Sequence, residues 1–269
     1  MRISSAIEEA IQASGFWHQI VRLDRVGSTN DVAKELASRG APEGVVVVAE
    51  EQTAGRGRMD RRWVAPARSS LLCSILLRPQ LSPRQANQLT MLCSMAAADA
   101  IERVAGLPVL IKWPNDLVVR TTEGEERPER WRKVAGILTE TGVVGGDLEF
   151  TVVGIGINVN VTRNELPHLA PDATSLRVEV GREVERAALL LALLKNVELR
   201  YEGLTEGRNP AEEWSTRLAT LGRRIRATTA EGALEGVADA VDDDGALLVR
   251  TDDGTVHRLM SGDVTLSAA

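Results

Sequence analysis

The sequence predicts an α+β protein in which a mixed β-sheet flanked by helices, over residues 1–222, precedes a small all-β barrel over residues 223–269. In the first part, apolar runs typical of buried strands are interspersed with longer segments of helical period. In the second, short alternating segments are separated by the turn signals Asp243–Gly245 and Asp252–Gly254. With 43% hydrophobic and 26% charged residues, the 269-residue chain has ordinary globular composition and is long enough for one large and one small domain.

The expected helices are delimited by capping residues, proline and glycine. We expect them over residues 4–14, 31–39, 82–104, 183–203 and 210–221. The first is a short amphipathic segment, and Ser28–Asp31 offers N-cap side chains to the second. Pro83 and Pro210 stand at the starts of the third and the fifth, and a glycine follows the second, third and fifth.

The expected strands of the large domain are apolar and those of the barrel alternate. We expect strands over residues 45–49, 70–77, 109–113, 117–119, 134–141 and 150–161, then 224–229, 234–241, 246–251 and 256–260. The run Val45–Ala49 is β-branched almost throughout, so burial on both faces is expected. Pro114 cannot donate to a sheet ladder and therefore breaks the sheet pattern. Residues 53–62 are expected to form a loop, 121–131 an exposed hairpin tip and 142–147 a turn.

Composition argues against several classes of protein. Lys+Arg 32 against Asp+Glu 38 gives a net charge of −6, so no overall positive field attracts DNA or an anionic membrane. No apolar run approaches the roughly 20 residues of a transmembrane helix, and the first residues have no signal-peptide core. Cys73 and Cys93 lie in apolar stretches without metal-ligand spacing, so we expect buried core thiols in a reducing cytoplasm.

Four segments carry residues that bind anions or interrupt strands. Gly55–Arg58 (GRGR) combines glycines, which let a ligand approach the backbone, with arginines, which bind phosphate or carboxylate; a solvated basic loop is the alternative. Lys112–Asp116 (KWPND) lies at a strand end, where either chemistry or a turn is expected. Lys133–Leu138 (KVAGIL) brings a cation into a buried strand, or protects a strand edge. The glycines of Gly154–Val159 (GIGINV) mark a close approach or a bulge.

Taken in this order with Ser28–Asn30, these four segments resemble the biotin–protein ligase family, and the resemblance extends from about residue 20 through the barrel that the family carries at its C-terminus. It implies a class II synthetase-like sheet and an adenylate-forming ligase. Such an enzyme makes biotinyl-5′-AMP from biotin and ATP with Mg²⁺. It then passes biotin to a lysine of a biotin carboxyl carrier domain, as in acetyl-CoA carboxylase.

The resemblance also implies the site residues. Those that match biotin contacts are Ser28, Thr29, Gln52, Gly55, Arg56, Gly57, Arg58, Lys133 and Gly136. Those that match ATP contacts are Arg58, Arg61, Trp63, Lys112, Asn115 and Asn158. Catalytic roles fall on Lys133, Arg56, Arg58 and Asp116, and Asp116 is also the implied Mg²⁺ ligand. No protein nucleophile is needed, because biotin's own carboxylate attacks the α-phosphorus and the enzyme positions and neutralises anions.

Three alternatives and one departure accompany this interpretation. Where the family usually has a small or basic residue and then glycine after GRGR, this chain has Met59-Asp60. A lipoate or octanoate ligase shares the scaffold, although KWPND and the barrel favour biotin. A DNA-binding repressor is disfavoured because only 27 residues, without a basic recognition helix, precede Ser28. A biotin-binding module without activity would not need both GRGR and KWPND. We expect a monomer or weak homodimer that binds neither DNA nor a membrane.

Overall fold

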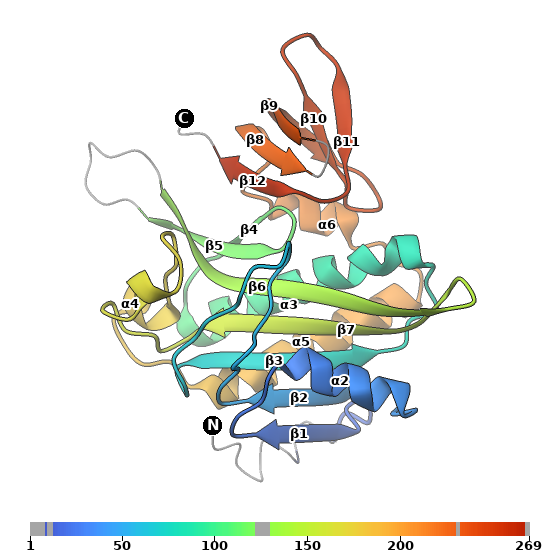
Figure 1. Cartoon of the computed structure of the whole chain (residues 1–269), viewed down its shortest axis with the longest axis vertical. Coiled ribbons are helices and arrows are strands. Elements are labelled where there is room, and N and C mark those ends of the chain that lie inside the picture. Colours follow the sequence, from blue (N-terminus) through green and yellow to red (C-terminus); the bar gives the residue numbers. More distant parts are fainter. Residues whose placement is uncertain (1–8, 10–12, 122–129, 230–231, 267–269) are drawn as a thin grey trace.

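The larger sheet is mixed, as predicted. The computed structural model describes residues 9, 13–121, 130–229 and 232–266. Its seven-stranded sheet has the order β1-β2-β3-β7-β6-β5-β4, in which only β1 and β2 run parallel (Figure 1). The strands are β1 (Gln19–Leu23), β2 (Val45–Ala49), β3 (Ser70–Leu77), β4 (Leu110–Lys112), β5 (Asp116–Thr121), β6 (Arg130–Val144) and β7 (Asp147–Asn158).

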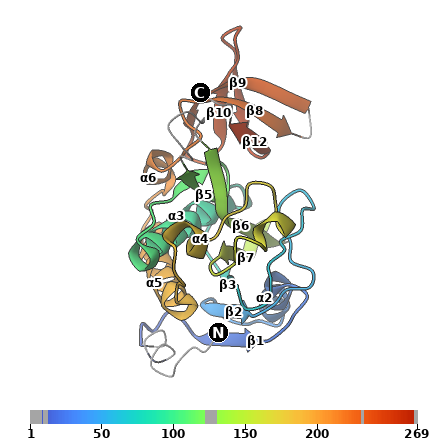
Figure 2. The same ribbon diagram turned by 90° about the vertical axis from the view of Figure 1, so that its left-hand side faces the viewer.

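Helices cover the two faces of this sheet unequally. On one face, α3 (Asn87–Ala105) and α5 (Arg186–Thr205) pack together against the sheet and form the larger core (Figure 2). On the other face, α2 (Thr29–Ser38) covers β2 and β3. The rest of that face carries the β2–β3 loop. Two short helices complete this part, α4 (Leu176–Val180) and α6 (Ala211–Thr216).

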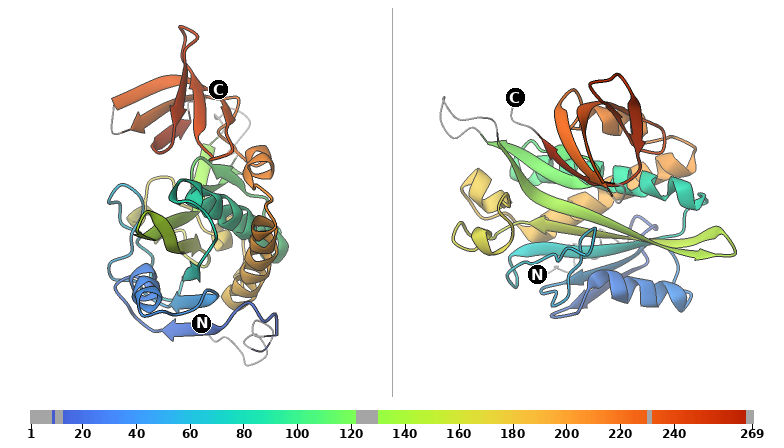
Figure 3. Two further views of the ribbon diagram at one scale, coloured as in Figure 1. Left: turned by 90° about the vertical axis from the view of Figure 1, so that its right-hand side faces the viewer. Right: turned by 45° about the horizontal axis from the view of Figure 1, so that its top comes forward.

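The C-terminal sheet is antiparallel, with the order β11-β10-β9-β8-β12. Its strands are β8 (Arg224–Thr229), β9 (Gly232–Val241), β10 (Leu247–Arg250), β11 (Val256–Leu259) and β12 (Asp263–Leu266). A second core, which includes Trp113, Trp214 and Ile225, joins this sheet to α3, β4 and α6. The indole nitrogen of Trp113 donates to the carbonyl of Gly245 at 2.9 Å. The small sheet therefore sits against the β4–β5 end of the large one (Figure 3).

Most expected elements are confirmed and several differ. Val45–Ala49 is buried throughout, and 70–77 is a strand with the predicted bounds. The helix predicted over 210–221 ends at Thr216. Beyond it the backbone pairs with the edge of β4, since the Ile111 amide donates to the Arg217 carbonyl at 2.9 Å and the Ala219 amide to the Ile111 carbonyl at 2.8 Å.

The remaining differences concern lengths and short elements. The strands predicted over 134–141 and 150–161 are β6 and β7, which extend to a tighter turn at Gly145-Gly146. Four elements were not predicted: β1, α4, β12 and a short 3-10 helix over Leu166–His168. The helix predicted over 4–14 and most of the tip predicted over 121–131 lie outside the described residues. None of the described helices is long and apolar enough to cross a membrane.

Candidate active site

A cavity of about 890 Å³ lies on the sheet face that α2 covers, between the β2–β3 loop and the C-terminal sheet. It is lined by every predicted site residue except Gly55: Ser28, Thr29, Gln52, Arg56, Gly57, Arg58, Arg61, Trp63, Lys112, Asn115, Asp116, Lys133, Gly136 and Asn158. Gly55 is buried within the loop, and an added Cβ there would come 2.5 Å from the Trp63 carbonyl oxygen. The structure therefore brings residues from five separate segments to one place.

A β-bulge in β6 turns Lys133 toward this cavity. Residues 133 and 136 are an odd number of positions apart and would point to opposite faces of a regular strand. However, Leu117 pairs with Ala135 and Val118 with Lys133, which leaves Val134 as an extra residue on β6. Val134 and Ala135 consequently both enter the larger core. Lys133 then shares the face of Gly136, whose ideal Cβ would lie 3.3 Å from the Lys133 Nζ.

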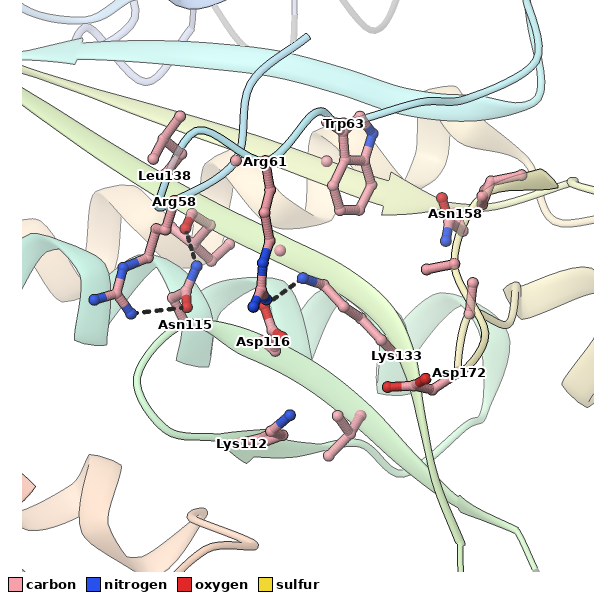
Figure 4. A pocket seen from close by; sticks show the side chains of 18 of the residues that line it. Arg58, Arg61, Trp63, Lys112, Asn115, Asp116, Lys133, Leu138, Asn158 and Asp172 are labelled. Carbon is pink, nitrogen blue, oxygen red and sulfur yellow. Dashed lines mark hydrogen bonds and ion pairs between the residues drawn. The ribbon is translucent and has the colours of Figure 1, made fainter. Parts of the chain in front are cut away.

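The Lys133 side chain is held by an aspartate, and its backbone by a second segment. Nζ forms an ion pair with Asp116 Oδ1 at 2.5 Å, and the ammonium lies 5.7 Å from the centre of the Trp63 ring (Figure 4). The Lys133 amide donates to the Asp172 carbonyl at 2.7 Å, and its carbonyl accepts from the Thr174 amide at 2.8 Å. This ammonium is therefore fixed at the cavity wall.

The KWPND segment supplies a polar edge at the end of β4. Asn115 Nδ2 donates to the Ile137 carbonyl at 2.6 Å, and its Oδ1 accepts from Arg58 at 3.3 Å, so Asn115 links that guanidinium to β6 (Figure 4). Burial lowers the pKa of Arg58, since it removes water that would stabilise the cation. Lys112 also points into this space and makes no ion pair with any residue in the described part of the chain.

Two glycines of β7 leave room for the side chains of Trp63 and Asn30. An added Cβ on Gly156 would come 2.6 Å from Cε2 of Trp63, and one on Gly154 would come 2.3 Å from Oδ1 of Asn30. Val153 and Ile155, which alternate with these glycines along β7, face the larger core on the opposite side of the sheet. The sequence led us to expect a ligand or another backbone close to the glycines of GIGINV, whereas the structure places two protein side chains there.

Two buried polar atoms beside Trp63 lack partners among the described residues. These are Nε1 of Trp63 and Oδ1 of Asn158. Asn158 Nδ2 donates to the Thr174 carbonyl at 3.0 Å, which leaves Oδ1 as a hydrogen-bond acceptor. Because an unpaired buried polar atom is costly, this end of the cavity is suited to a flat ligand that offers an amino group.

The N-terminus of α2 forms the opposite, polar end of the cavity. Ser28 occupies the N-cap position, but its side chain makes no capping hydrogen bond, so the predicted capping role is wrong. Gln52 caps the helix instead, because its Oε1 accepts from the Thr29 amide at 2.7 Å and from the Thr29 hydroxyl at 3.0 Å. The helix consequently starts at residue 29, two residues earlier than predicted.

The GRGR segment forms a tight hairpin. The Gly57 amide donates to the Arg61 carbonyl at 2.6 Å, and the Trp63 amide to the Gly55 carbonyl at 3.0 Å. Met59 and Asp60 have φ of 53° and 57°, and the Arg61 amide donates back to the Arg58 carbonyl at 3.2 Å. Two positive φ values at the centre of a turn define the type I′ geometry, which favours Asn-Gly. Asp60 thus has left-handed backbone, which aspartate tolerates better than most non-glycine residues.

Met59→Gly is expected to stabilise the protein by about 0.5–1 kcal/mol, because methionine is strained in the left-handed region and glycine is not. Met260→Gly is the matched control. Met260 is also exposed, but its φ is not positive, so glycine there should lower the free energy of unfolding. Urea denaturation of both variants measures these effects, and equal destabilisation by both would contradict strain at Met59.

Two of the four loop arginines bind carboxylates. Arg56 contacts both carboxylate oxygens of Asp31 at 2.7 Å and Glu140 Oε2 at 3.0 Å, so its guanidinium is held at the base of the loop. These contacts do not place it on a reacting group, and its catalytic role stays a prediction. Arg61 contacts Asp263 of β12 at 2.6 Å, which lowers the pKa of that carboxyl. The loop is thereby tied to the C-terminal sheet.

Several lining residues escaped sequence reasoning. They are Asp172 from the segment before α4, Trp131 and Arg132 from β6, and Arg223, Asp263 and Leu266 from the C-terminal sheet and its approach. The guanidinium of Arg223 lies 5.2 Å from the centre of the Trp131 ring. No local sequence pattern identifies them, and Arg223, Asp263 and Leu266 line the cavity only because of the position of the C-terminal sheet.

The two cysteines are core thiols, as predicted. Both Cys73 and Cys93 are free and buried. Burial raises the pKa of Cys73 to about 12, so its thiol stays protonated and unreactive at neutral pH. Within residues 13–121, 130–229 and 232–266, no three His, Cys, Asp or Glu side chains gather as a metal site.

The cavity is rich in cations and has Asp116 at its centre, an aromatic ring at one end and a helix N-terminus at the other. These features define an enzyme site for joining anionic substrates. Comparison with known proteins identifies the family. The model of the biotin/lipoate A/B protein ligase family matches residues 23–158, just over half of the chain, and that of the biotin protein ligase C-terminal domain matches residues 220–267.

Individual relatives agree with the family models. The bifunctional ligase/repressor BirA of Bacillus subtilis is 35% identical over 265 residues, 97% of this chain and 78% of that protein. The biotin–[acetyl-CoA-carboxylase] ligase of Mycobacterium tuberculosis is 33% identical over 96% of this chain and 92% of its own length. The biotin protein ligase from Aquifex aeolicus in complex with biotin and ATP has 27% identity and a TM-score of 0.74, over 94% of this chain and 100% of that one. The chain belongs to the biotin/lipoate A/B protein ligase family and is an adenylate-forming ligase.

Proposed function

We propose that this protein activates biotin with ATP to biotinyl-5′-AMP and transfers biotin to a lysine of a biotin carboxyl carrier domain. The observation that carries the proposal is the Lys133–Asp116 pair at the middle of one continuous cavity. The polar α2 end of that cavity fits the ureido head of biotin. The end with Trp63 and Asn158 fits adenine, whose amino group suits the free Asn158 oxygen. The names of the biotin–[acetyl-CoA-carboxylase] ligase of Mycobacterium tuberculosis and of the Aquifex aeolicus ligase complex with biotin and ATP support the same assignment.

In the first half-reaction, the biotin carboxylate oxygen attacks the α-phosphorus of ATP and pyrophosphate leaves with the electrons of the broken bond. One donor of the Lys133 ammonium is held by Asp116, the other two are directed to the carboxylate and the α-phosphate, and Arg58 neutralises charge on the phosphate side. Trp63 stacks on the base, and Asn115 keeps Arg58 in position. In the second half-reaction, the acceptor amine attacks the biotinyl carbonyl and AMP leaves. Asp116 accepts the proton that the amine loses.

Magnesium is proposed as the metal that accompanies ATP. It is bound in nucleotide sites by one or two carboxylates together with phosphate oxygens. Asp116 fits this role because its side chain lines the cavity beside Asn115 and a carboxylate has a second oxygen besides the Oδ1 that contacts Lys133. A dedicated cluster of acids is not required. Bound Mg²⁺ would neutralise charge on the phosphates and leaving pyrophosphate.

Mass spectrometry of the acceptor tests the transfer step. The protein is incubated with biotin, ATP and Mg²⁺ together with an isolated biotin carboxyl carrier domain. We expect one biotin on its acceptor lysine, and none when that lysine is replaced by arginine or when a lipoyl domain is supplied. Modification of the lipoyl domain in preference to the biotin carrier would contradict the proposed acceptor.

A further inference from the structure

Glu140 is a carboxylate at the centre of a polar cluster just outside the cavity. It follows Gly136 and Leu138 on the cavity-facing side of β6 but does not line the cavity itself. Its oxygens accept from Asn30 Nδ2 at 2.6 Å, Lys34 Nζ at 2.7 Å and Arg56 at 3.0 Å. Burial alone would raise the pKa of Glu140, but these three donors hold it below its ordinary value, so the carboxylate is charged at neutral pH.

One side of this cluster anchors the loop. Arg56 bridges Glu140 on β6 and Asp31 in the first turn of α2, with distances of 3.0 Å and 2.7 Å. Its side chain is 37% exposed, whereas the Glu140 side chain is 25% exposed. Because Arg56 is the second residue of GRGR, these contacts fix the start of the hairpin that carries Arg58 and Arg61 over the cavity.

The other side of the cluster supports the N-terminus of α2. Asn30 is buried, and its Oδ1 lies 2.5 Å from the hydroxyl of Ser74 on β3. The same hydroxyl lies 2.7 Å from the Thr29 hydroxyl, which contacts Gln52. A continuous series of polar contacts, in which the two hydroxyl protons of Thr29 and Ser74 serve three oxygen pairs, therefore runs from Glu140 through Asn30 to the polar end of the cavity.

We propose that Glu140 is a positioning residue for the biotin end of the site, which holds the Arg56 hairpin and the α2 N-terminus in their ligand-binding arrangement. Glu140 does not touch the reactants. The inference rests on the proposed function, because the polar end is assigned to biotin. It follows that loss of the Glu140 charge weakens biotin binding more than ATP binding, since Trp63 and Asn158 lie outside the cluster.

Glu140→Gln tests this with two readouts. The amide is nearly isosteric but cannot accept from three donors, and it removes a charge-assisted set of hydrogen bonds. In ATP–pyrophosphate exchange we expect the KM for biotin to rise about tenfold, with the KM for ATP changed less than about twofold and kcat largely retained. In the ligand-free protein, trypsin should cleave after Arg56 and Arg58 several times faster than in the wild type. Asp31→Asn, at the more exposed partner, should shift both readouts in the same direction by less.

The matched control is Glu35→Gln, which breaks an exposed ion pair with Arg39 near the far end of α2 and should change neither readout. Equal rises in the two KM values for Glu140→Gln, or unchanged cleavage in both cluster variants, would overturn the positioning role. If Glu140→Gln does not fold, Asp31→Asn decides the same question. A wild-type protein that shows no exchange with biotin would refute the proposed function. The cleavage rates of the ligand-free proteins would still test whether Glu140 holds the Arg56 hairpin in place.

Discussion

Lys133→Ala is expected to lose a factor of about 10²–10³ in the rate of adenylation, the usual effect of removing one preorganised donor from a transition state. Lys133 is one of only four lysines among 32 basic residues, and it stands where the β6 bulge turns it into the cavity. Its ammonium, 2.5 Å from Asp116, is compact enough to bridge a carboxylate oxygen and an α-phosphate oxygen.

Lys133→Arg separates geometry from charge. We expect it to recover little activity, because the ammonium already lies 2.5 Å from Asp116, and a planar guanidinium is bulkier and presents its donors in a different geometry. Pyrophosphate exchange with biotin measures both variants, and thermal melts check that they are folded. Exchange by Lys133→Arg at the wild-type rate would mean that only the positive charge matters. Wild-type exchange by Lys133→Ala would leave Lys133 as a strand residue without a catalytic role.

Gly156→Ala is expected to raise the KM for ATP by about tenfold to a hundredfold, since stacking of a base on an aromatic side chain contributes roughly 1–3 kcal/mol. An added Cβ would come 2.6 Å from Cε2 of Trp63, so the indole must leave its place above β7. Trp63→Ala should give an effect of similar size. Gly27→Ala, where an added Cβ meets nothing within 4 Å, is the matched control and should leave the KM unchanged.

The double variant Gly156→Ala/Trp63→Ala tests the physical cause. If Gly156→Ala acts only by displacing the indole, it should cost almost nothing once the indole is gone, and the two effects will not add. Additive losses would show instead that the new methyl group collides with the nucleotide or distorts β7. In that case the account of Trp63 as the base-stacking residue would be wrong.

Elements whose residues carry a strong local pattern could be predicted from the sequence. The β-branched run at β2 and the capped helix α3 are examples. β1 was missed because QIVRL is short, begins with the polar Gln19 and is interrupted by Arg22. The end of α6 was misplaced because the backbone after Thr216 pairs with Ile111, a tertiary interaction that overrides helical periodicity.

The site was predictable as a set of segments but less so as a geometry. GRGR, KWPND, KVAGIL and GIGINV do meet at one cavity. However, no spacing indicates that Val134 bulges out of register, or that Arg56 is bound by Glu140, 84 positions along the chain. The contribution of Asp263 likewise depends on how the C-terminal sheet packs on Trp113 and Trp214. Such contacts arise from tertiary packing, which local patterns do not encode.

The most direct test of the central claim is ATP–pyrophosphate exchange measured side by side with biotin and with lipoate. The account predicts that the wild-type protein with Mg²⁺ exchanges label between pyrophosphate and ATP when biotin is present. It predicts little exchange with lipoate, and none when both acids are omitted. Exchange that depends on lipoate and not on biotin would contradict the claim that this cavity activates biotin.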